Sequence, residues 1–388
     1  MKKNFKRIWH IGAWNRNIGD WTAGYNLHRM LENHASERDL AVSFYLVDSQ
    51  RGVFHDALIE QINDECDLML LGAGGMIFNR PQDESASGWA FNISVEKLKE
   101  IKVPMVVYGI GYNKFYFDTN EWPEYMGNHL RTLQNKAKIF STRDEGSRQM
   151  LHKAFGLNLN KTEIIPDPGM RHFDRHIEIP GLKKDCSIIG LNWAGDRPDE
   201  RFTKPWEKNR KYFLDTLREV LIKVVKEENA QVLYIPHLED VDVSIFEELK
   251  IGFPKGSIIS LYDQLPHLYP PAGEIMYHNV PFMTNVYRQV DLVLGMRGHS
   301  CIFPFGAGTK FIPIGSHNKV IYFADDVGIP NYAIRMIDQK IENFDFMYDQ
   351  ISRCLHDKKY DKMLPNLIKE QFDKLNKANE RVIDILDN

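Results

Sequence analysis

The chain of 388 residues is poor in cysteine and has no long apolar run. Its four cysteines are Cys66, Cys186, Cys301 and Cys354. They lie far apart and form no CxxC pair, which argues against a cysteine-based zinc site or a disulfide framework and fits a reducing compartment. No stretch reaches the length of a membrane-spanning helix, and His10 and Asn15 interrupt the apolar residues near the start, so a signal-peptide core is missing. We therefore expect a cytoplasmic protein.

Several ligand-binding signatures are also missing from the sequence. It contains no GxGxxG dinucleotide fingerprint, no GxxxxGK[ST] phosphate loop and no HExxH metal motif. The pair Asp240 and Asp242 has the DxD spacing of some metal-dependent glycosyltransferases, but it precedes a predicted helix and is explained as helix capping. A net charge of −4 with a pI near 6.4 gives no general attraction to nucleic acid. We expect no metal, no cofactor and no nucleic-acid partner.

Short β-branched runs alternate with segments of helical period along the whole chain, which predicts parallel sheets built from βαβ units. The predicted strands of the first half are Ile8–Gly12, Val42–Val47, Asp67–Leu71, Met105–Gly109, Ile139–Thr142 and Thr162–Pro166, and those of the second half are Ile188–Asn192, Val232–Pro236, Leu292–Gly295 and Phe311–Gly315. The predicted helices include Thr22–Glu32, Asn92–Glu100, Glu145–Phe155, Phe213–Lys226 and Val243–Leu249. A polar stretch at 179–185 indicates a linker between the two halves.

This pattern predicts two doubly wound α/β domains, of the Rossmann type, that face each other across a cleft. We assign residues 1–180 to the first domain, 185–345 to the second and 346–388 to helices that pack back on them. Within the last segment, Leu364–Leu386 has the period of an amphipathic helix. Packing against a domain explains that helix best, and contact with a membrane surface is the alternative.

The strongest local feature is the segment Asp291–Ser300, DLVLGMRGHS, in which a buried strand ends at a polar turn before a helix. Ligands bind at the carboxyl ends of parallel strands, and helix N-termini attract anions. Arg297 is suited to hold a carboxylate or phosphate, and His299 to transfer a proton. The alternative is a surface arginine beside a histidine that caps the helix. The next strand ends in another polar loop that offers Lys319, which is either part of the same site or a solvated lysine.

Glycines and charged residues also follow the strands of the first half. The segment Asn17-Ile-Gly-Asp20 brings Gly19, which allows close approach of the backbone, and Asp20, which caps a helix. Glycine turns are predicted at 72–75, which includes Gly74 and Gly75, and at 109–111, which includes Gly111. Such turns imply that a ligand or another domain lies close to the backbone. At the next strand end, Arg143 either reaches into the cleft or pairs with Asp144.

In their order and spacing, these segments resemble the polysaccharide pyruvyltransferase family over about residues 8–328. The resemblance includes Asn17-Ile-Gly-Asp20, both glycine segments, Thr142-Arg-Asp-Glu145 with Ser147, Asp167-Pro168, Gly295-Met-Arg-Gly-His299 and Lys319. It implies a GT-B-like fold and transfer of pyruvate from phosphoenolpyruvate to two hydroxyls of a sugar in a cell-surface glycan, as a ketal. Two positions depart from the family pattern: Gly298 stands where a bulky apolar residue is usual, and Ala73 interrupts the first glycine run.

By position, the resemblance assigns the Arg-x-His motif to Arg297 and His299, with Gly298 between them. It assigns the remaining cations to Arg143 and Lys319. Phosphoenolpyruvate carries a carboxylate and a phosphate and needs at least two cationic groups, which Arg143, Arg297 and Lys319 would supply. The hypothesis makes His299 the general acid toward the methylene carbon, Lys319 the group that stabilises the departing phosphate, and Asp20 the base. Binding residues would also include Asn17, Gly19, Gly74, Gly75, Gly111 and Gly298.

The alternative function is a GT-B glycosyltransferase that uses a nucleotide sugar, because arginine and lysine hold a diphosphate equally well. A catalytically silent glycan-binding protein is a third interpretation, and it requires that the basic side chains do not converge. The acceptor would be a sugar, as an oligosaccharide or a lipid-linked precursor at the inner face of the membrane. Aromatic candidates for stacking on a sugar are Phe115–Phe117, Trp122 and Trp193, each of which is equally explained by packing. The oligomeric state does not follow from the sequence.

Overall fold

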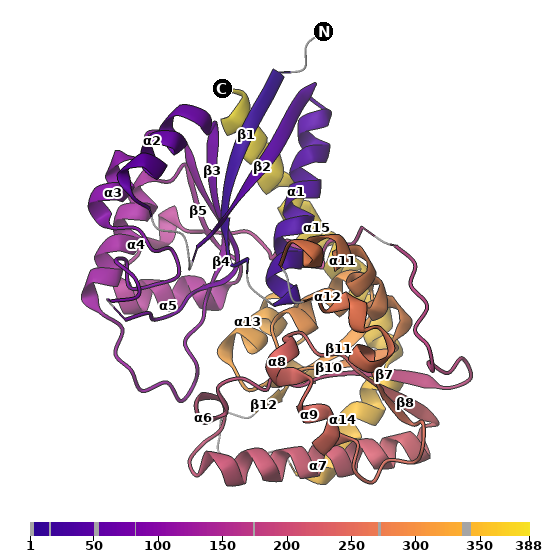
Figure 1. Cartoon of the computed structure of the whole chain (residues 1–388). Helices are drawn as coiled ribbons and strands as arrows, with labels where there is room; N and C mark the ends of the chain where they lie inside the picture. Colours follow the sequence, from indigo (N-terminus) through magenta and orange to yellow (C-terminus); the bar gives the residue numbers. More distant parts are fainter. Residues whose placement is uncertain are drawn as a thin grey trace.

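The computed structural model describes residues 4–14, 17–49, 54–81, 83–173, 175–270, 273–335 and 343–388. In these ranges the chain forms two six-stranded sheets, each with all of its strands parallel. Figure 1 shows them as two α/β halves, one above the other, with helices on the faces of each sheet. The fold is that of two Rossmann-like domains.

The first sheet has the order β2-β1-β3-β4-β5-β6. Its strands are β1 Asn4–Gly12, β2 Leu40–Asp48, β3 Leu68–Ile77, β4 Met105–Tyr112, β5 Ile139–Thr142 and β6 Glu163–Ile164. Its helices are α1 Ile18–Ser36, α2 Asp56–Glu65, α3 Val95–Glu100, α4 Glu124–Lys136 and α5 Glu145–Phe155. Every residue of β4 and β5 is buried, as expected for central strands that are covered on both faces.

The second sheet has the order β12-β11-β10-β7-β8-β9. Its strands are β7 Ser187–Asn192, β8 Ala230–Tyr234, β9 Ile258–Ser260, β10 Leu292–Gly295, β11 Lys310–Gly315 and β12 Ile334–Arg335. The helices that follow are α6 Pro198–Arg201, α7 Trp206–Glu227, α8 Glu239–Asp242, α9 Ile245–Leu249, α10 Leu261–Gln264, α11 Gly273–Val286, α12 His299–Ala307, α13 Asn318–Asp326, α14 Phe344–His356 and α15 Lys358–Asp387.

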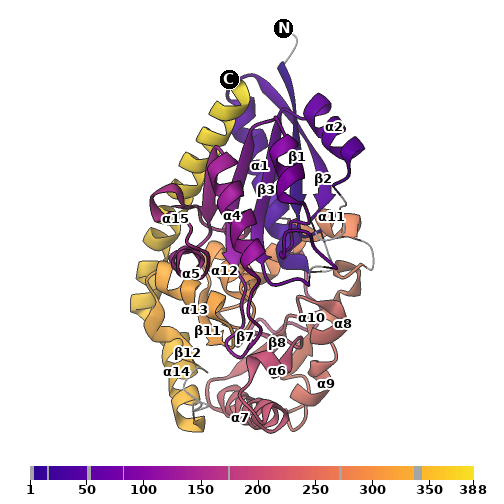
Figure 2. The same cartoon turned by 90° about the vertical axis from the view of Figure 1, so that its left-hand side faces the viewer.

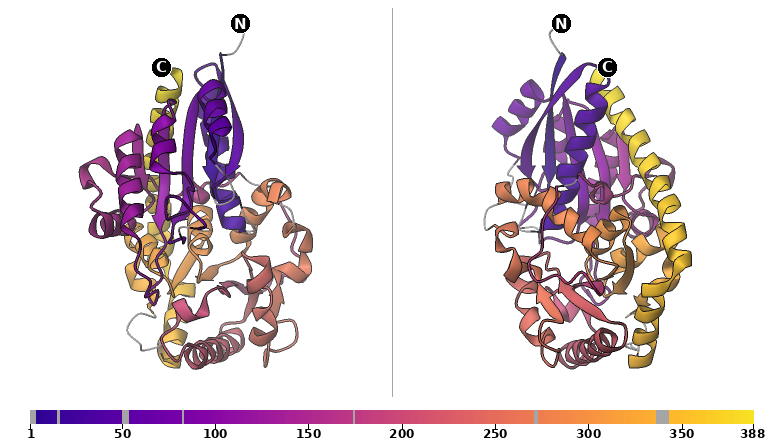
Figure 3. Two further views of the ribbon diagram at one scale, coloured as in Figure 1. Left: turned by 60° about the vertical axis from the view of Figure 1, so that its left-hand side comes forward. Right: turned by 90° about the vertical axis from the view of Figure 1, so that its right-hand side faces the viewer.

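The C-terminal helix α15 runs along both halves of the molecule, as Figures 2 and 3 show. It packs on β11 and α12 of the second half and on α1 of the first. The buried hydroxyl of Tyr108 in β4 donates a 2.8 Å hydrogen bond to the Asn379 Oδ1 atom, and Arg381 pairs with Glu163. The apolar side of α15 therefore joins the core of the first half although the helix follows the second half in sequence.

The glycine segments differ from their prediction as turns. Residues 72–75 lie within β3 and residues 109–111 within β4, because both strands continue past the glycines to Ile77 and Tyr112. The φ angles of Gly72 and Gly74 are +139° and +103°, and a Cβ atom on Gly72 would lie 2.1 Å from the Tyr108 carbonyl oxygen. Glycine is therefore required by close backbone contact inside a sheet rather than by a chain reversal.

The predicted bounds match closely where local signals are strong. The helix α5 has the predicted bounds because Asp144 caps its start, accepting from the Ser147 N–H, and Gly156 ends it at a φ of +68°. The short strands β9 and β12 were not predicted, and the predicted strand at 162–166 is reduced to β6. Such edge strands carry too few apolar residues to give a periodic signal.

The assigned domain bounds remain a prediction. The two sheets use residues 4–164 and 187–335, and the expected linker at 179–185 lies between them. Within the described ranges, no helix is long and apolar enough to cross a lipid bilayer.

Candidate active site

A small cavity of about 70 Å3 lies between the two halves, next to the point in each sheet where the strand order reverses. In the first sheet that point lies between β1 and β3, and in the second between β7 and β10. Crevices form at the carboxyl ends of strands at such points. The residues that line the cavity are Asn17, Asp20, Gly75, Asn113, Arg143, His237, Arg297, Gly298, His299 and Lys319.

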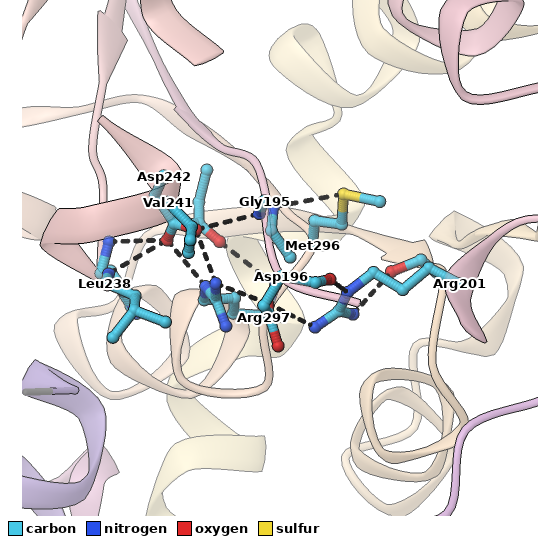
Figure 4. Close-up of polar contacts among 12 residues, drawn as sticks. Gly195, Asp196, Arg201, Leu238, Val241, Asp242, Met296 and Arg297 are labelled. Carbon is cyan, nitrogen blue, oxygen red and sulfur yellow. Dashed lines mark hydrogen bonds and ion pairs between the residues drawn. The ribbon is translucent and has the colours of Figure 1, made fainter. Parts of the chain in front are cut away.

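Arg297 is held by carboxylates of its own half of the molecule. Its Nε and Nη2 atoms donate to the two carboxylate oxygens of Asp242 at 2.7 and 2.6 Å, and Nη2 also lies 2.7 Å from Asp196 (Figure 4). Burial alone would lower the pKa of Arg297, but these two carboxylates outweigh it and raise the pKa further. Arg297, which we expected to hold a carboxylate or phosphate of a substrate, therefore forms a bidentate pair with Asp242, and the rest of its guanidinium group lines the cavity.

Asp196 joins Arg297 to a second buried arginine, Arg201. The Arg201 Nη2 atom lies 2.9 Å from the Asp196 carboxylate and its Nε atom donates to the Asp196 carbonyl oxygen at 2.8 Å (Figure 4). Burial opposes ionisation of Asp196, yet Arg201, Arg297 and Lys319 together hold its pKa well below the ordinary value. This arrangement keeps two guanidinium groups charged inside the protein beside the cavity.

His299 begins α12 and reaches across to the first half of the molecule. Its Nε2 atom lies 3.3 Å from the Asp167 carboxylate, at ion-pair distance, and its ring stacks on Phe303. A Cβ atom on Gly19 would lie only 2.1 Å from the His299 Nδ1 atom. The absence of a side chain at Gly19 thus makes room for the imidazole ring at the start of α1.

Arg143 contributes the cation of the first half. Its Nη1 atom donates to Asp167 at 3.2 Å and its Nε atom lies 3.4 Å from Asp144. A Cβ atom on Gly111 would lie 2.6 Å from the Arg143 Nε atom, so this glycine accommodates the guanidinium. Burial opposes ionisation of Asp167, but His299 and Arg143 outweigh it and lower its pKa to about 2. Asp167 therefore remains an anion between Arg143 and His299.

Lys319 lies in the first turn of α13, where His317 caps the helix by accepting from the Lys319 N–H. Its Nζ atom donates to the Asn113 Oδ1 atom of the first half at 2.9 Å. Burial and the nearby Arg143 and Arg201 lower the pKa of Lys319 from 10.5 to about 7. The group can therefore gain or lose a proton near neutral pH.

The segment at the end of β1 supplies the opposite wall. Asn17 caps α1 by accepting from the Gly19 N–H at 2.9 Å, and it forms a backbone bridge with Leu238 of the other half. The Asp20 carboxylate lies 3.2 Å from the position of a Cβ atom on Gly74. Both Asn17 and Asp20 line the cavity, so the start of α1 faces the start of α12.

The structure brings together side chains that the sequence analysis selected from distant segments. Asn17, Asp20, Gly75, Arg143, Arg297, Gly298, His299 and Lys319 line one cavity. Gly19, Gly74 and Gly111 lie behind it, where they make room for His299, Asp20 and Arg143. The chemical role of each residue remains a proposal.

Several residues of the site were not predicted from the sequence. Asp242 was interpreted only as a helix cap, but besides accepting from the backbone N–H groups of His237 and Leu238 it is the bidentate partner of Arg297. Asn113 follows a glycine-rich strand end, and its position there was the available signal. Asp196 and Arg201 lie in a loop and a four-residue helix that no motif marks.

The aromatic candidates for sugar stacking fall into three environments. Trp193 is buried in the core against Phe202 and Phe213. Phe115 is buried against His317 of the other half. Trp122 alone among these three is half-buried and lines a second recess, which adjoins the cavity at Asn113.

Comparison with known families gives one match, to the family described as "Polysaccharide pyruvyl transferase", over residues 2–318. The matched segment contains every lining residue of the cavity except Lys319, which follows it directly. No curated protein sequence matches the chain.

Solved structures with the same fold are distant in sequence. The Anabaena protein Alr3699/HepE, in a complex with UDP and glucose, has 10% identity and a TM-score of 0.52, with 98% of each chain covered. A putative UDP-N-acetylglucosamine 2-epimerase of Listeria monocytogenes has 14% identity and a TM-score of 0.54, over 93% of this chain and 91% of that one. A glycosyltransferase of Rickettsia africae has 12% identity and a TM-score of 0.54, over 100% and 98%. These similarities establish the GT-B-like fold.

Proposed function

The chain belongs to the polysaccharide pyruvyl transferase family and is a transferase, and from its cavity we propose that the pyruvyl donor is phosphoenolpyruvate. The product would be a pyruvate ketal on a sugar of a polysaccharide or of its precursor, formed with release of phosphate. The observation that supports this most strongly is the convergence of Arg143, Arg297, His299 and Lys319, from both halves, on one small cavity.

Lys319 is the cation of the cavity best placed to bind a small anion. Two carboxylates already contact each arginine, Asp144 and Asp167 at Arg143 and Asp196 and Asp242 at Arg297. Lys319 instead donates to a neutral amide, Asn113, so its charge is available to a substrate. The N-terminus of α12 adds partial positive charge on the same side.

In the proposed reaction, His299 donates a proton to the methylene carbon of phosphoenolpyruvate, and positive charge develops at C2. The Asp167 carboxylate, 3.3 Å from the His299 Nε2 atom, orients the imidazole ring. A sugar hydroxyl then forms a bond to C2 and gives its proton to a base, for which Asp20 is our candidate. The C2–O bond to phosphate breaks with its electron pair on the phosphate, which Lys319 stabilises or protonates, and a second hydroxyl closes the ketal with loss of its proton.

A second candidate is a nucleotide-sugar glycosyltransferase, which the UDP complex of a structural neighbour brings into consideration. Such an enzyme needs a carboxylate to bind a ribose. Asp196 and Asp242 of the second half are both engaged by arginines, which disfavours this use.

The two candidates are separated by thermal unfolding of the intact protein with added ligands. Phosphoenolpyruvate at about 100 times its Kd should raise the stability by about 2.7 kcal/mol, whereas UDP- and GDP-sugars should leave the melting temperature unchanged. A shift with nucleotide sugars alone would refute the pyruvyl donor. Inorganic phosphate serves as the control for simple anion binding and should give the smaller shift.

A further inference from the structure

A recess of about 360 Å3 adjoins the cavity and shares one lining residue with it, Asn113. The first half of the molecule contributes Phe78, Asn79, Pro81, Asn113, Asp118, Asn120, Glu121 and Trp122, and the second half contributes Arg197 and Glu200. Asn113 donates from Nδ2 to the Gly75 carbonyl oxygen at 3.3 Å and accepts from Lys319 on its other amide atom. One side chain thus forms the border between the recess and the cationic cavity.

The groups in the recess are of the kinds that bind sugar hydroxyls. The half-buried amide of Asn79 has no hydrogen-bond partner within the described part of the chain. The Asp118 carboxylate accepts from the Asn120 N–H at 2.9 Å and from the Trp122 indole N–H at 3.4 Å, which leaves oxygen lone pairs for a ligand. Phe78 and Trp122 add apolar surface beside these polar groups.

The charge of the recess is opposite to that of the cavity. Three carboxylates line it, from Asp118, Glu121 and Glu200, and the one base among the lining residues is Arg197, which donates to Glu200 at 3.3 Å. Asp118 and Glu121 would repel a ligand with its own negative charge, whereas they would accept hydrogen bonds from the hydroxyls of an uncharged ligand.

We propose that this recess is the acceptor subsite and that it binds an uncharged pyranose, with two of its hydroxyls directed past Asn113 toward the donor. The assignment rests on the proposed function, since it takes the neighbouring cavity as the donor site. A larger recess of about 510 Å3, lined by Trp21, Phe44 and Tyr277 among others, shares no lining residue with the cavity and is a poorer candidate for a reacting group.

The first test is binding of sugars to the intact protein, measured by saturation-transfer NMR with phosphoenolpyruvate present. The probes are methyl glycosides of hexoses, of N-acetylhexosamines and of hexuronic acids. We expect saturation transfer to at least one uncharged glycoside and none to the hexuronides. Binding of hexuronides in preference to every uncharged glycoside, or of no glycoside, would overturn the proposal.

Variants locate the bound sugar. Asn79→Ala and Asp118→Asn should each weaken glycoside binding about tenfold, the effect of one lost hydrogen bond to a polar ligand. Asn128→Ala, an exposed change on α4 outside the recess, is the matched control and should bind as the parent protein does. Unchanged affinity in both recess variants would place the acceptor elsewhere.

Failure of this subsite is distinguishable from failure of the proposed function. Thermal stabilisation by phosphoenolpyruvate should be the same in the parent, the two recess variants and Asn128→Ala, because none of these substitutions changes a cation of the cavity. If phosphoenolpyruvate stabilises all four proteins but the two recess variants bind glycosides as tightly as the parent protein does, only the subsite assignment is wrong. If phosphoenolpyruvate stabilises none of them, the donor assignment is wrong.

A charge experiment tests the selectivity directly. The double variant Asp118→Asn, Glu121→Gln removes two negative charges from the recess and should allow hexuronides to bind while uncharged glycosides remain bound, though more weakly. Continued exclusion of hexuronides by this variant would show that the carboxylates do not set the selectivity, contrary to the proposal.

Discussion

At the scale of single residues, Lys319 combines burial with a neutral hydrogen-bond partner. Asn113 accepts its hydrogen bond but brings no charge, while Arg143 and Arg201 oppose its protonation. Its pKa near 7 follows from this environment, and a bound dianion would raise it again.

The first prediction is that affinity for phosphoenolpyruvate falls as pH rises above about 7, by about tenfold per pH unit while the bound form stays protonated. Below pH 7 the lysine is already charged, so the affinity should be flat there until another group titrates. Titration calorimetry in buffers of different ionisation enthalpy measures both the affinity and the proton taken up on binding. Lys319→Arg keeps a permanent charge and should remove the uptake; uptake that persists in this variant would assign it to another group.

The lowered pKa also has a consequence for stability. Between pH 7 and 10.5 the unfolded chain binds a proton at Lys319 that the folded chain does not, so this group makes the fold more stable as pH rises through that window. Lys319→Met removes that dependence, which a comparison of melting temperatures at several pH values would measure.

The second prediction concerns His299, our candidate acid. His299→Ala should strongly slow phosphate release while phosphoenolpyruvate still stabilises the protein, because Arg143, Arg297 and Lys319 remain. We expect a loss of about 100-fold to 10,000-fold in kcat, the usual contribution of acid catalysis. Phosphate release is measured with a coupled assay, and turnover close to that of the parent protein would remove His299 from this role.

The third prediction concerns Gly298, where the family pattern has a bulky apolar residue. Its φ and ψ are both −53°, so any residue fits the backbone, and an added Cβ atom would lie 3.7–3.8 Å from Lys319 and 3.8 Å from the Arg143 Nη2 atom. A longer side chain would therefore point between two cations of the cavity. Gly298→Leu should keep the melting temperature within a few degrees and weaken phosphoenolpyruvate binding about tenfold or more, whereas Gly298→Ala should have a small effect. Unchanged binding in the leucine variant would place the donor away from residue 298.

At the scale of secondary-structure elements, the sequence predicted most strands of the two sheets. It predicted turns at the glycines of β3 and β4, where the strands in fact continue. The apolar runs of β5 and β10 and the caps of α5 are local signals, and these elements have their predicted bounds. The course of β3 and β4 through their glycines depends on contacts such as that of Gly72 with Tyr108, which a single strand does not reveal. The same limit explains the candidate site, because the cations follow strand ends while their partners Asp196 and Asp242 lie in separate loops and short helices.

The fourth prediction is that the start of α1 positions His299. Gly19→Ala improves helix propensity by about 1 kcal/mol, but the new Cβ atom collides with the imidazole ring. The variant should remain folded by circular dichroism and lose about tenfold or more in kcat, since a displacement of about 1 Å is costly in catalysis. Ser36→Ala at the other end of α1 serves as the control. Full activity of Gly19→Ala would mean that the ring can move without effect.

At the scale of the whole molecule, α15 ties the two halves together. Figure 2 shows it along the side of both sheets, and the Tyr108–Asn379 hydrogen bond lies at its contact with the first. The site needs this alignment because Lys319 and His299 of one half contact Asn113 and Asp167 of the other.

The fifth prediction is that Asn379→Ala lowers the free energy of unfolding by about 1–3 kcal/mol, because the buried Tyr108 hydroxyl loses its partner. Denaturant titration followed by tryptophan fluorescence measures the change. The double variant with Tyr108→Phe should recover part of the loss, since neither polar group is then left unsatisfied. Additive losses in the two single variants would contradict a direct coupling.

The position of α15 also bears on how the chain folds during its synthesis. Asn379 follows Tyr108 by 271 residues, so the first half is translated long before the helix that completes its core. Until α15 has been translated, the sheet of the first half has one apolar strip uncovered on the nascent chain. Contacts between residues so far apart in sequence form late and slowly. A stop codon that removes only the last turns of α15 should therefore damage the first half of the protein, the part that was made earliest.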